Sequence, residues 1–171
     1  EQLRLVEQPI TPPAIGEVQV RVKAAGLNRA ELLFLAGRYL VQPKLPAFIG
    51  FEASGIVQDF GKSANRFSIG QAVSITPNFD PTLHGAIGQV VNIPTSAIQP
   101  KPDGVSFIDA AAFWMAYPTA WGGLVQTGGL TMGSGQTVLV TAASSSVGIA
   151  AIQIAKNYGA TVIATTRTTE K

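Results

Sequence analysis

The first clear pattern in the chain is an alternation of valines with polar residues over 17–25. A period of two is typical of a strand with one buried face, so this segment is predicted to be a β-strand. Leu3 and Leu5 also alternate with polar residues, which predicts another strand at the start of the chain. Residues 28–35 predict a short helix, with Asn28 as its N-cap.

Three more short strands are predicted before about residue 100. They cover 48–58, 69–75 and 86–93, and prolines and glycines separate them. Gly50 and Gly55 lie inside the first of these strands, where a glycine usually marks a bulge or a close approach of another backbone. Many short strands divided by turns predict an all-β barrel or sandwich.

The pattern changes after this point to helices alternating with apolar strands. Residues 109–115 and 119–126 predict two helical pieces that Pro118 separates. A strand, a helix and a second strand are then predicted at 137–141, 146–158 and 160–165. This order predicts a βαβ unit with parallel, buried strands.

Charge and cysteine content narrow the classes of function. The 171 residues include 12 basic and 10 acidic residues, thinly spread, which argues against binding to nucleic acid or an anionic membrane. No apolar run is long enough to span a bilayer and no signal peptide is visible, so a cytoplasmic location is expected. Cysteine is absent, and the one histidine, His84, is expected to be a turn residue, so no metal site is predicted.

A turn of small residues joins the strand at 137–141 to the helix that follows. It lies where a dinucleotide-binding fold has its glycine-rich phosphate turn, and serine hydroxyls and helix-start N–H groups suit a diphosphate. Gly148 suits tight packing of the helix on the strand. The alternative is a purely structural serine cap. The candidate cofactor contacts in this turn are Ser144, Ser145, Ser146, Val147 and Gly148.

The end of the second strand of this unit favours NADPH over NADH. Enzymes that bind the 2′-hydroxyl of NAD carry an acidic residue about 20 residues past the turn. This chain has Thr166 and Arg167 there, with Lys171 close behind. Hydroxyls and cations match a 2′-phosphate, so NADPH is the expected cofactor, with a solvated basic loop as the alternative.

Several short segments, in this order and spacing, resemble the zinc-free quinone oxidoreductase branch of the medium-chain dehydrogenase/reductase superfamily. They are Gly16-Glu17-Val18, Ala24-Ala25-Gly26-Leu27-Asn28, Gly37-Arg38-Tyr39, Gly50-Phe51-Glu52-Ala53-Ser54-Gly55, Tyr117-Pro118-Thr119-Ala120 and Gln153-Ile154-Ala155-Lys156. The resemblance implies an α/β fold with an all-β part. A GroES-like β-barrel domain without its first strand would cover 1–115, and the first βαβ unit of a truncated Rossmann domain would cover 116–171.

The resemblance also implies a reaction without metal. Zinc members of the superfamily have a cysteine where this chain has Asn28 and a histidine where it has Phe51. NADPH would lie between the two domains and reduce a quinone, an enone or another conjugated carbonyl. Asn28 would contact the nicotinamide ribose or the substrate, and Thr119 would lie near the carboxamide. Tyr39 would donate to the substrate oxygen, with loop packing as its alternative role.

Two other functions fit the same sequence. One is an enoyl-thioester reductase of the same architecture, and the other is a non-enzymatic NADPH-binding or interaction protein. The βαβ segment argues against a free-standing GroES-like interaction module. We expect the full-length protein to be a homodimer with a small-molecule substrate, and the 171-residue chain alone to be inactive.

Overall fold

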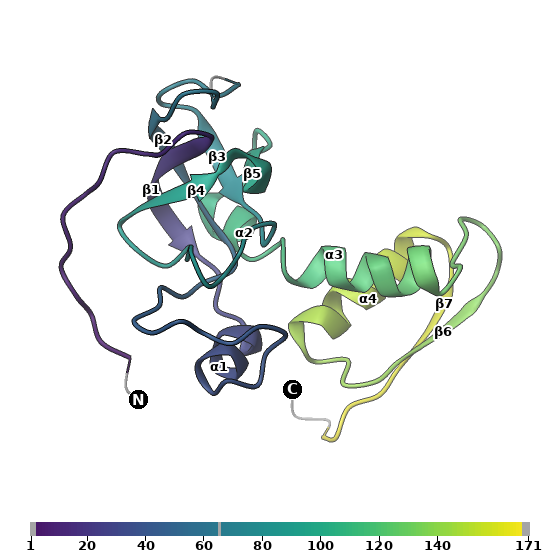
Figure 1. Ribbon diagram of the computed structural model, residues 1–171. Helices are drawn as coiled ribbons and strands as arrows, with labels where there is room; N and C mark the ends of the chain where they lie inside the picture. The colour runs from purple at the N-terminus through teal and green to yellow at the C-terminus, as the bar shows by residue number, and fades with distance from the viewer. Residues whose placement is uncertain (1–2, 65, 169–171) are drawn as a thin grey trace. The chain divides into compact units, whose positions relative to one another are not determined.

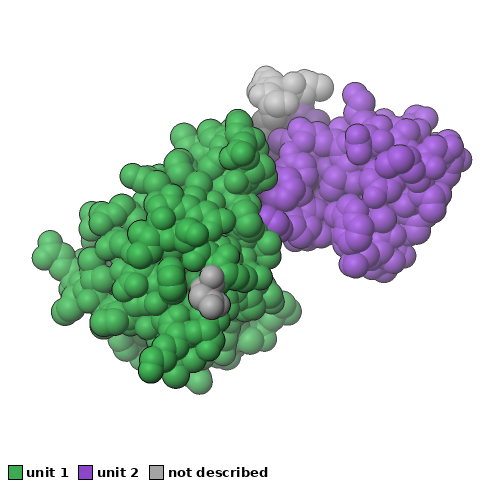
Figure 2. Space-filling model, turned by 90° about the horizontal axis from the view of Figure 1, so that it is seen from above, with its two compact units in different colours: residues 1–111 green, residues 112–171 purple. Residues whose placement is uncertain are grey.

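The computed structural model describes residues 3–64 and 66–168. The chain divides into two compact units, Glu1–Ala111 and Ala112–Lys171, which Figure 2 shows in different colours. The domain boundary predicted between residues 115 and 116 lies close to this division.

The first unit is built on a five-stranded antiparallel sheet with the strand order β4-β1-β2-β3-β5 (Figure 1). Its elements are β1 (Glu17–Ala25), α1 (Arg29–Leu35), β2 (Ala53–Phe60), β3 (Ala72–Ile75), β4 (Val90–Pro94), a 3-10 turn (Thr95–Ala97), β5 (Ile98–Pro100) and α2 (Phe107–Ala111). Val18 and Val20 of β1 are fully buried in the core of this sheet. The valines that predicted β1 fill the core, although Gln19 between them is also buried, and the predicted bounds of the strand are confirmed.

The strand predicted around Leu3 and Leu5 is wrong. Residues 3–14 have no regular secondary structure, Leu3 is 61% exposed, and Leu5 is fully exposed. The edge strands β4 and β5 each have one free side, but residues 3–14 form a ladder with neither, and both leucines face solvent. The alternation at the start of the chain therefore has no buried face to fill.

Three strands begin later than the sequence predicts. The strand predicted from 48 begins at Ala53, the one predicted from 69 begins at Ala72, and the one predicted from 86 begins at Val90. Gly50 has a φ of +103°, which interrupts an extended backbone before β2. Its carbonyl oxygen accepts the Ala86 N–H at 3.0 Å. The segment before β2 is therefore a loop that is hydrogen-bonded to the loop before β4.

The close approaches predicted at the two glycines near β2 are confirmed. A Cβ on Gly50 would lie 2.6 Å from the Ile87 nitrogen, and one on Gly55 would lie 2.3 Å from the Arg21 oxygen. Neither position has room for a side chain, because neighbouring backbone occupies the space.

The second unit contains the predicted βαβ arrangement. Its elements are α3 (Ala116–Trp121), a π-helical turn (Gly122–Thr127), β6 (Thr137–Val140), α4 (Ser146–Asn157) and β7 (Thr161–Ala164). β6 and β7 are parallel, and α3, α4 and β6 share a core of small residues that includes Ala116, Ala150 and Val140. None of the helices in the described part of the chain is long and apolar enough to cross a membrane.

The helix break predicted at Pro118 is wrong, because Pro118 lies inside α3. It occupies the first turn, where a backbone N–H has no acceptor within the helix, so proline costs no hydrogen bond there. The helix predicted at 109–115 is also shifted and forms α2 instead. Ser106 Oγ accepts the Asp109 N–H at 3.0 Å and starts α2 early.

Candidate functional site

The turn between β6 and α4 holds the helix start against the end of the strand. A Cβ on Gly148 would lie 2.7 Å from the Ala142 oxygen and 2.9 Å from Ala143 Cα. The tight packing predicted for Gly148 is therefore confirmed. The Ala142 oxygen also accepts the Ser145 N–H at 2.9 Å, which closes the turn.

Ser145 is the N-cap of α4, and its Oγ accepts the Gly148 N–H at 3.0 Å. The first N–H groups of any helix have no acceptor within the helix, and this bond satisfies one of them. Ser146 and Val147 lie in the same first turn, at the positive end of the helix dipole. The turn therefore offers an anion the N–H groups of Ser146 and Val147, and the Ser145 hydroxyl, which accepts the Gly148 N–H, can still donate its own proton.

Ala142 has a φ of +51°, in the left-handed region that residues other than glycine rarely adopt. The conformation costs an alanine about 1–2 kcal/mol. Ala142 lies in the turn between β6 and α4, and its oxygen is the atom closest to a Cβ placed on Gly148. This strain was not predicted from the sequence, although a small residue at a turn position usually held by glycine was its signal.

The residues after β7 lie beside this turn. Val140 at the end of β6 pairs with Ala164 at the end of β7, and the Ala143 N–H donates to the Thr165 oxygen at 3.0 Å. Arg167, which is exposed, lies two residues after Thr165. The structure thus brings together the ends of the two strands that were predicted, separately, to bind the diphosphate and the 2′-phosphate. Thr166 belongs to the same exposed segment, and Lys171 lies outside the described residues.

Thr119 lies on α3, where its hydroxyl donates to the Met115 oxygen at 2.6 Å. This bond to the preceding helical turn is common for threonine in helices. The side chain is exposed. Its contact with the nicotinamide carboxamide stays a prediction.

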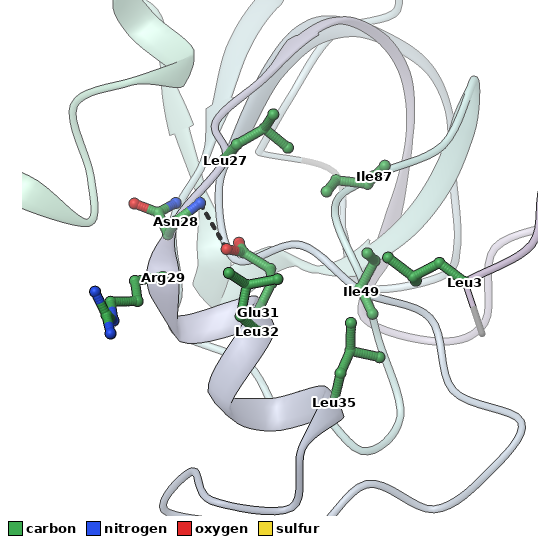
Figure 3. A pocket seen from close by; sticks show the side chains of 9 residues that line it. All are labelled: Leu3, Leu27, Asn28, Arg29, Glu31, Leu32, Leu35, Ile49 and Ile87. Atoms are coloured by element: carbon green, nitrogen blue, oxygen red, sulfur yellow. Dashed lines mark hydrogen bonds between the residues drawn. The ribbon is translucent and has the colours of Figure 1, made fainter. Parts of the chain in front are cut away.

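In the first unit, Asn28 is the N-cap of α1, as predicted, and two buried carboxylates bind it, of which Figure 3 shows Glu31. Its backbone N–H donates to Glu31 Oε2 at 2.6 Å, and its side-chain Nδ2 donates to Glu52 Oε1 at 2.9 Å. Glu31 Oε1 also accepts the Phe51 N–H at 3.3 Å. Glu31 and Glu52 are only 5% and 2% exposed, so Asn28 is held from two sides.

Tyr39 is half-buried, and its ring packs on Phe51 with centroids 5.2 Å apart. Phe51 is 5% exposed and also meets the edge of Phe34. The position at which zinc members have a histidine is therefore a buried aromatic contact. Residues 51 and 52 connect the two predicted catalytic residues, since Phe51 contacts Tyr39 and Glu52 contacts Asn28.

A pocket of about 510 Å³ lies beside Asn28 (Figure 3). Its volume is within the range of pockets that bind small molecules. Asn28, Arg29 and Glu31 supply its polar groups. Its apolar lining is Leu3, Leu27, Leu32, Leu35, Ile49 and Ile87. This pocket was not predicted from the sequence, because its lining comes from segments far apart in the chain.

The antiparallel sheet of the first unit and the βαβ turn of the second define the class of a medium-chain dehydrogenase/reductase. Residues 14–103 match the family "Alcohol dehydrogenase GroES-like domain", and the chain belongs to this family. The human protein "Synaptic vesicle membrane protein VAT-1 homolog-like" is 37% identical over 153 residues, 90% of this chain and 35% of that protein. Together with relatives named quinone oxidoreductase, this confirms the quinone oxidoreductase-like branch.

Solved structures of the same fold differ in cofactor and reaction. The Escherichia coli quinone oxidoreductase complexed with NADPH has a TM-score of 0.85 and 31% identity, covering 96% of this chain and 48% of that one. An NAD-dependent alcohol dehydrogenase has a TM-score of 0.85 and 34% identity, covering 97% and 54%. CurK enoyl reductase has a TM-score of 0.79 and 26% identity, covering 93% and 48%. The chain thus spans about half the length of these structures.

Proposed function

We propose that the protein to which this chain belongs is an NADPH-dependent oxidoreductase that reduces a quinone, an enone or another conjugated carbonyl without zinc. The observation that carries the proposal is the β6–α4 turn. Gly148 lets the helix start pack directly on Ala142 and Ala143, with Arg167 following the neighbouring strand. The named quinone oxidoreductases among the relatives support the same reaction.

The residues present fit a phosphorylated dinucleotide. The N–H groups of Ser146 and Val147, at the start of α4, would hold the diphosphate, with the Ser144 hydroxyl beside them. Thr166 and Arg167 would hold the 2′-phosphate, because a guanidinium forms charge-assisted hydrogen bonds with phosphate oxygens. Arg167 is the reason to prefer NADPH, although one similar structure is named as NAD-dependent.

NADPH, when bound, supplies the hydride. The Tyr39 hydroxyl would donate a hydrogen bond to the substrate oxygen as negative charge develops on it. Packing on Phe51 limits the movement of the Tyr39 ring, with the two centroids 5.2 Å apart, so the donor is held in place before the substrate arrives. No metal is needed in this scheme, because the hydroxyl takes the place of a Lewis acid.

A second candidate function is reduction of the carbon–carbon double bond of an enoyl thioester. The similarity to CurK enoyl reductase favours it, and the leucine-rich pocket beside Asn28 is suited to an acyl chain. A protein that binds NADPH without catalysis is the third candidate, since the name of the VAT-1 homolog-like relative states no reaction.

Turnover by the full-length protein tests these functions against one another. We expect NADPH oxidation with a quinone panel, a slower rate or none with enoyl thioesters, and no change after treatment with a metal chelator. Tyr39→Phe should lower kcat/KM about 100-fold, because it removes one donor to the developing oxyanion, and should leave NADPH binding unchanged. Tyr158→Phe is the control, since the Tyr158 hydroxyl contacts Trp121 in the second unit. NADPH binding without turnover of any substrate would contradict the proposal.

A further inference from the structure

Glu52 is a buried carboxylate beside a residue of the proposed site. It is 2% exposed, and its Oε1 accepts the Asn28 side-chain NH₂ at 2.9 Å. Taking a carboxylate out of water is costly unless hydrogen bonds compensate it, so its presence in this position calls for a role. The family resemblance assigned none to it.

The backbone fixes the place of this carboxylate. Glu52 directly precedes β2, and its carbonyl oxygen accepts the Gly26 N–H at 3.1 Å. A Cβ on Gly26 would lie 2.4 Å from Glu52 Oε1, so the absence of a side chain at Gly26 makes room for the carboxylate. The next residues of the two strands, Ala25 and Ala53, are paired in the sheet. The register of β1 and β2 therefore sets where Glu52 meets Asn28.

A carboxylate also determines which way the Asn28 amide faces. The amide has one donor end and one acceptor end, whereas an ionised carboxylate only accepts. In the structure the NH₂ end faces Glu52 Oε1 at 2.9 Å, so the Oδ1 end faces the opposite way. In Figure 3 the side-chain oxygen of Asn28 points away from Glu31, the second buried carboxylate. Asn28 is half-buried, so ligands have access to its side chain.

We propose that Glu52 is a positioning residue that holds the Asn28 amide by its NH₂ end, so that the site presents the carbonyl oxygen of Asn28 as a hydrogen-bond acceptor. The ligand group that Asn28 takes is then a hydroxyl donor and not a carbonyl. A ribose hydroxyl of the nicotinamide nucleotide or a hydroxyl of the substrate supplies this chemistry. The inference rests on the proposed function in one respect, namely that Asn28 contacts the ligand.

The orientation itself is tested without any ligand, by NMR of the full-length protein. The Asn28 side-chain NH₂ protons should exchange slowly with solvent, because they face a buried carboxylate. Glu52→Gln keeps the size of the side chain but adds a donor, so the amide is no longer fixed. We expect the exchange of these protons to be about tenfold faster in this variant. Ser74→Ala, which removes a buried hydroxyl elsewhere in the sheet, should leave them unchanged.

The consequence for binding is tested by titrating NADPH alone and then measuring KM for a quinone. Glu52→Gln should weaken binding of the ligand that Asn28 contacts about three- to tenfold. A weaker NADPH complex identifies the ribose as the hydroxyl donor, whereas a higher KM with unchanged NADPH binding identifies the substrate. The double variant Asn28→Asp with Glu52→Gln exchanges the two groups and again leaves an acceptor at position 28, so it should regain most of the lost affinity.

The outcomes separate this inference from the proposed function. A wild-type protein that does not bind NADPH contradicts the proposed function, and the slow exchange of the Asn28 NH₂ still supports the positioning by Glu52. A wild-type protein that binds NADPH, with Glu52→Gln identical to it in exchange, in affinity and in KM, overturns the inference. Failure of the double variant to recover affinity, in a folded protein, overturns the assignment of a hydroxyl donor.

Discussion

Ala142 shows how a single residue stores strain at the proposed phosphate turn. Its φ of +51° places it in a conformation that favours glycine, while its oxygen accepts the Ser145 N–H at 2.9 Å. An alanine there restricts the unfolded chain more than glycine does, but it costs more in the folded state. The balance of these two effects can be measured directly.

We predict that Ala142→Gly stabilises the protein. Relief of the strain outweighs the added freedom of the unfolded chain by about 0.5–1 kcal/mol, which corresponds to a rise in Tm of about 1–4 °C. Ala143→Gly is the matched control, because Ala143 is 9% exposed in the core of the same turn and has no positive φ. This control should lower the Tm. A lower Tm for Ala142→Gly as well would contradict the account of strain.

At the scale of residues, the sequence identified the groups that carry recognisable motifs and missed their partners. Asn28 and Tyr39 were selected from their segments, but the contact of Asn28 with Glu52 spans 24 positions. Side-chain pairs at that separation depend on the register of β1 and β2, which the sequence pattern leaves open. A carboxylate directly before a strand, in a segment of small and apolar residues, was the available signal for Glu52.

At the scale of elements, the start of α4 depends on the absence of one side chain. Gly148 lies in the first turn of the helix, and a Cβ there would be 2.7 Å from the Ala142 oxygen. Backbone atoms of the turn cannot give way as a flexible side chain can. The same contact keeps the first N–H groups of α4 close to the turn, so we expect stability and the proposed nucleotide binding to depend on it together.

We expect Gly148→Ala to lower the free energy of unfolding by about 2 kcal/mol, since the turn must shift to admit the methyl group. The Tm should fall by about 4–8 °C, and NADPH should bind more weakly. Gly123→Ala is the control, because nothing lies within 4 Å of a Cβ at Gly123. It should leave both quantities close to those of the wild type. Normal NADPH affinity in Gly148→Ala would contradict the placement of the diphosphate at this helix start.

The sequence predicted elements well where a periodic pattern coincided with burial. β1 is of this kind, because its valines fill a core. The parallel strands β6 and β7 were predicted correctly as elements, but the prediction that they are buried is wrong, because most of their described residues are exposed. The prediction failed where local chemistry decided the outcome. Pro118 is tolerated within the first turn of α3, Gly50 interrupts the segment before β2, and the alternating leucines near residue 3 stay exposed to solvent.

At the scale of the whole molecule, the second unit presents an apolar sheet face. Val138 and Val162 pack with α4, whereas the alternate residues Leu139 and Ile163 are 62% and 51% exposed. Parallel strands are normally covered on both faces. The solved relatives are about twice as long as this chain, which covers 48% of the Escherichia coli quinone oxidoreductase.

We therefore predict that the 171-residue chain, produced alone, binds a fluorescent hydrophobic dye strongly, and that the full-length protein does not. Replacing Leu139 and Ile163 together by threonine should reduce dye binding to the short chain, because threonine suits a strand and exposes less apolar surface. Equal dye binding by the short chain and the full-length protein would show that this face is not covered by additional sequence.

The most direct test of the central claim is a titration of the full-length protein with NADPH and with NADH, followed by nicotinamide fluorescence. We predict that NADPH binds about 10- to 100-fold more tightly, and that Arg167→Ala removes this preference by weakening NADPH alone. Lys156→Ala, a loss of positive charge in the last turn of α4, should change neither affinity. Equal affinities in the wild type, or an equal loss for both nucleotides in Arg167→Ala, would contradict the assignment of an NADPH site to the ends of β6 and β7.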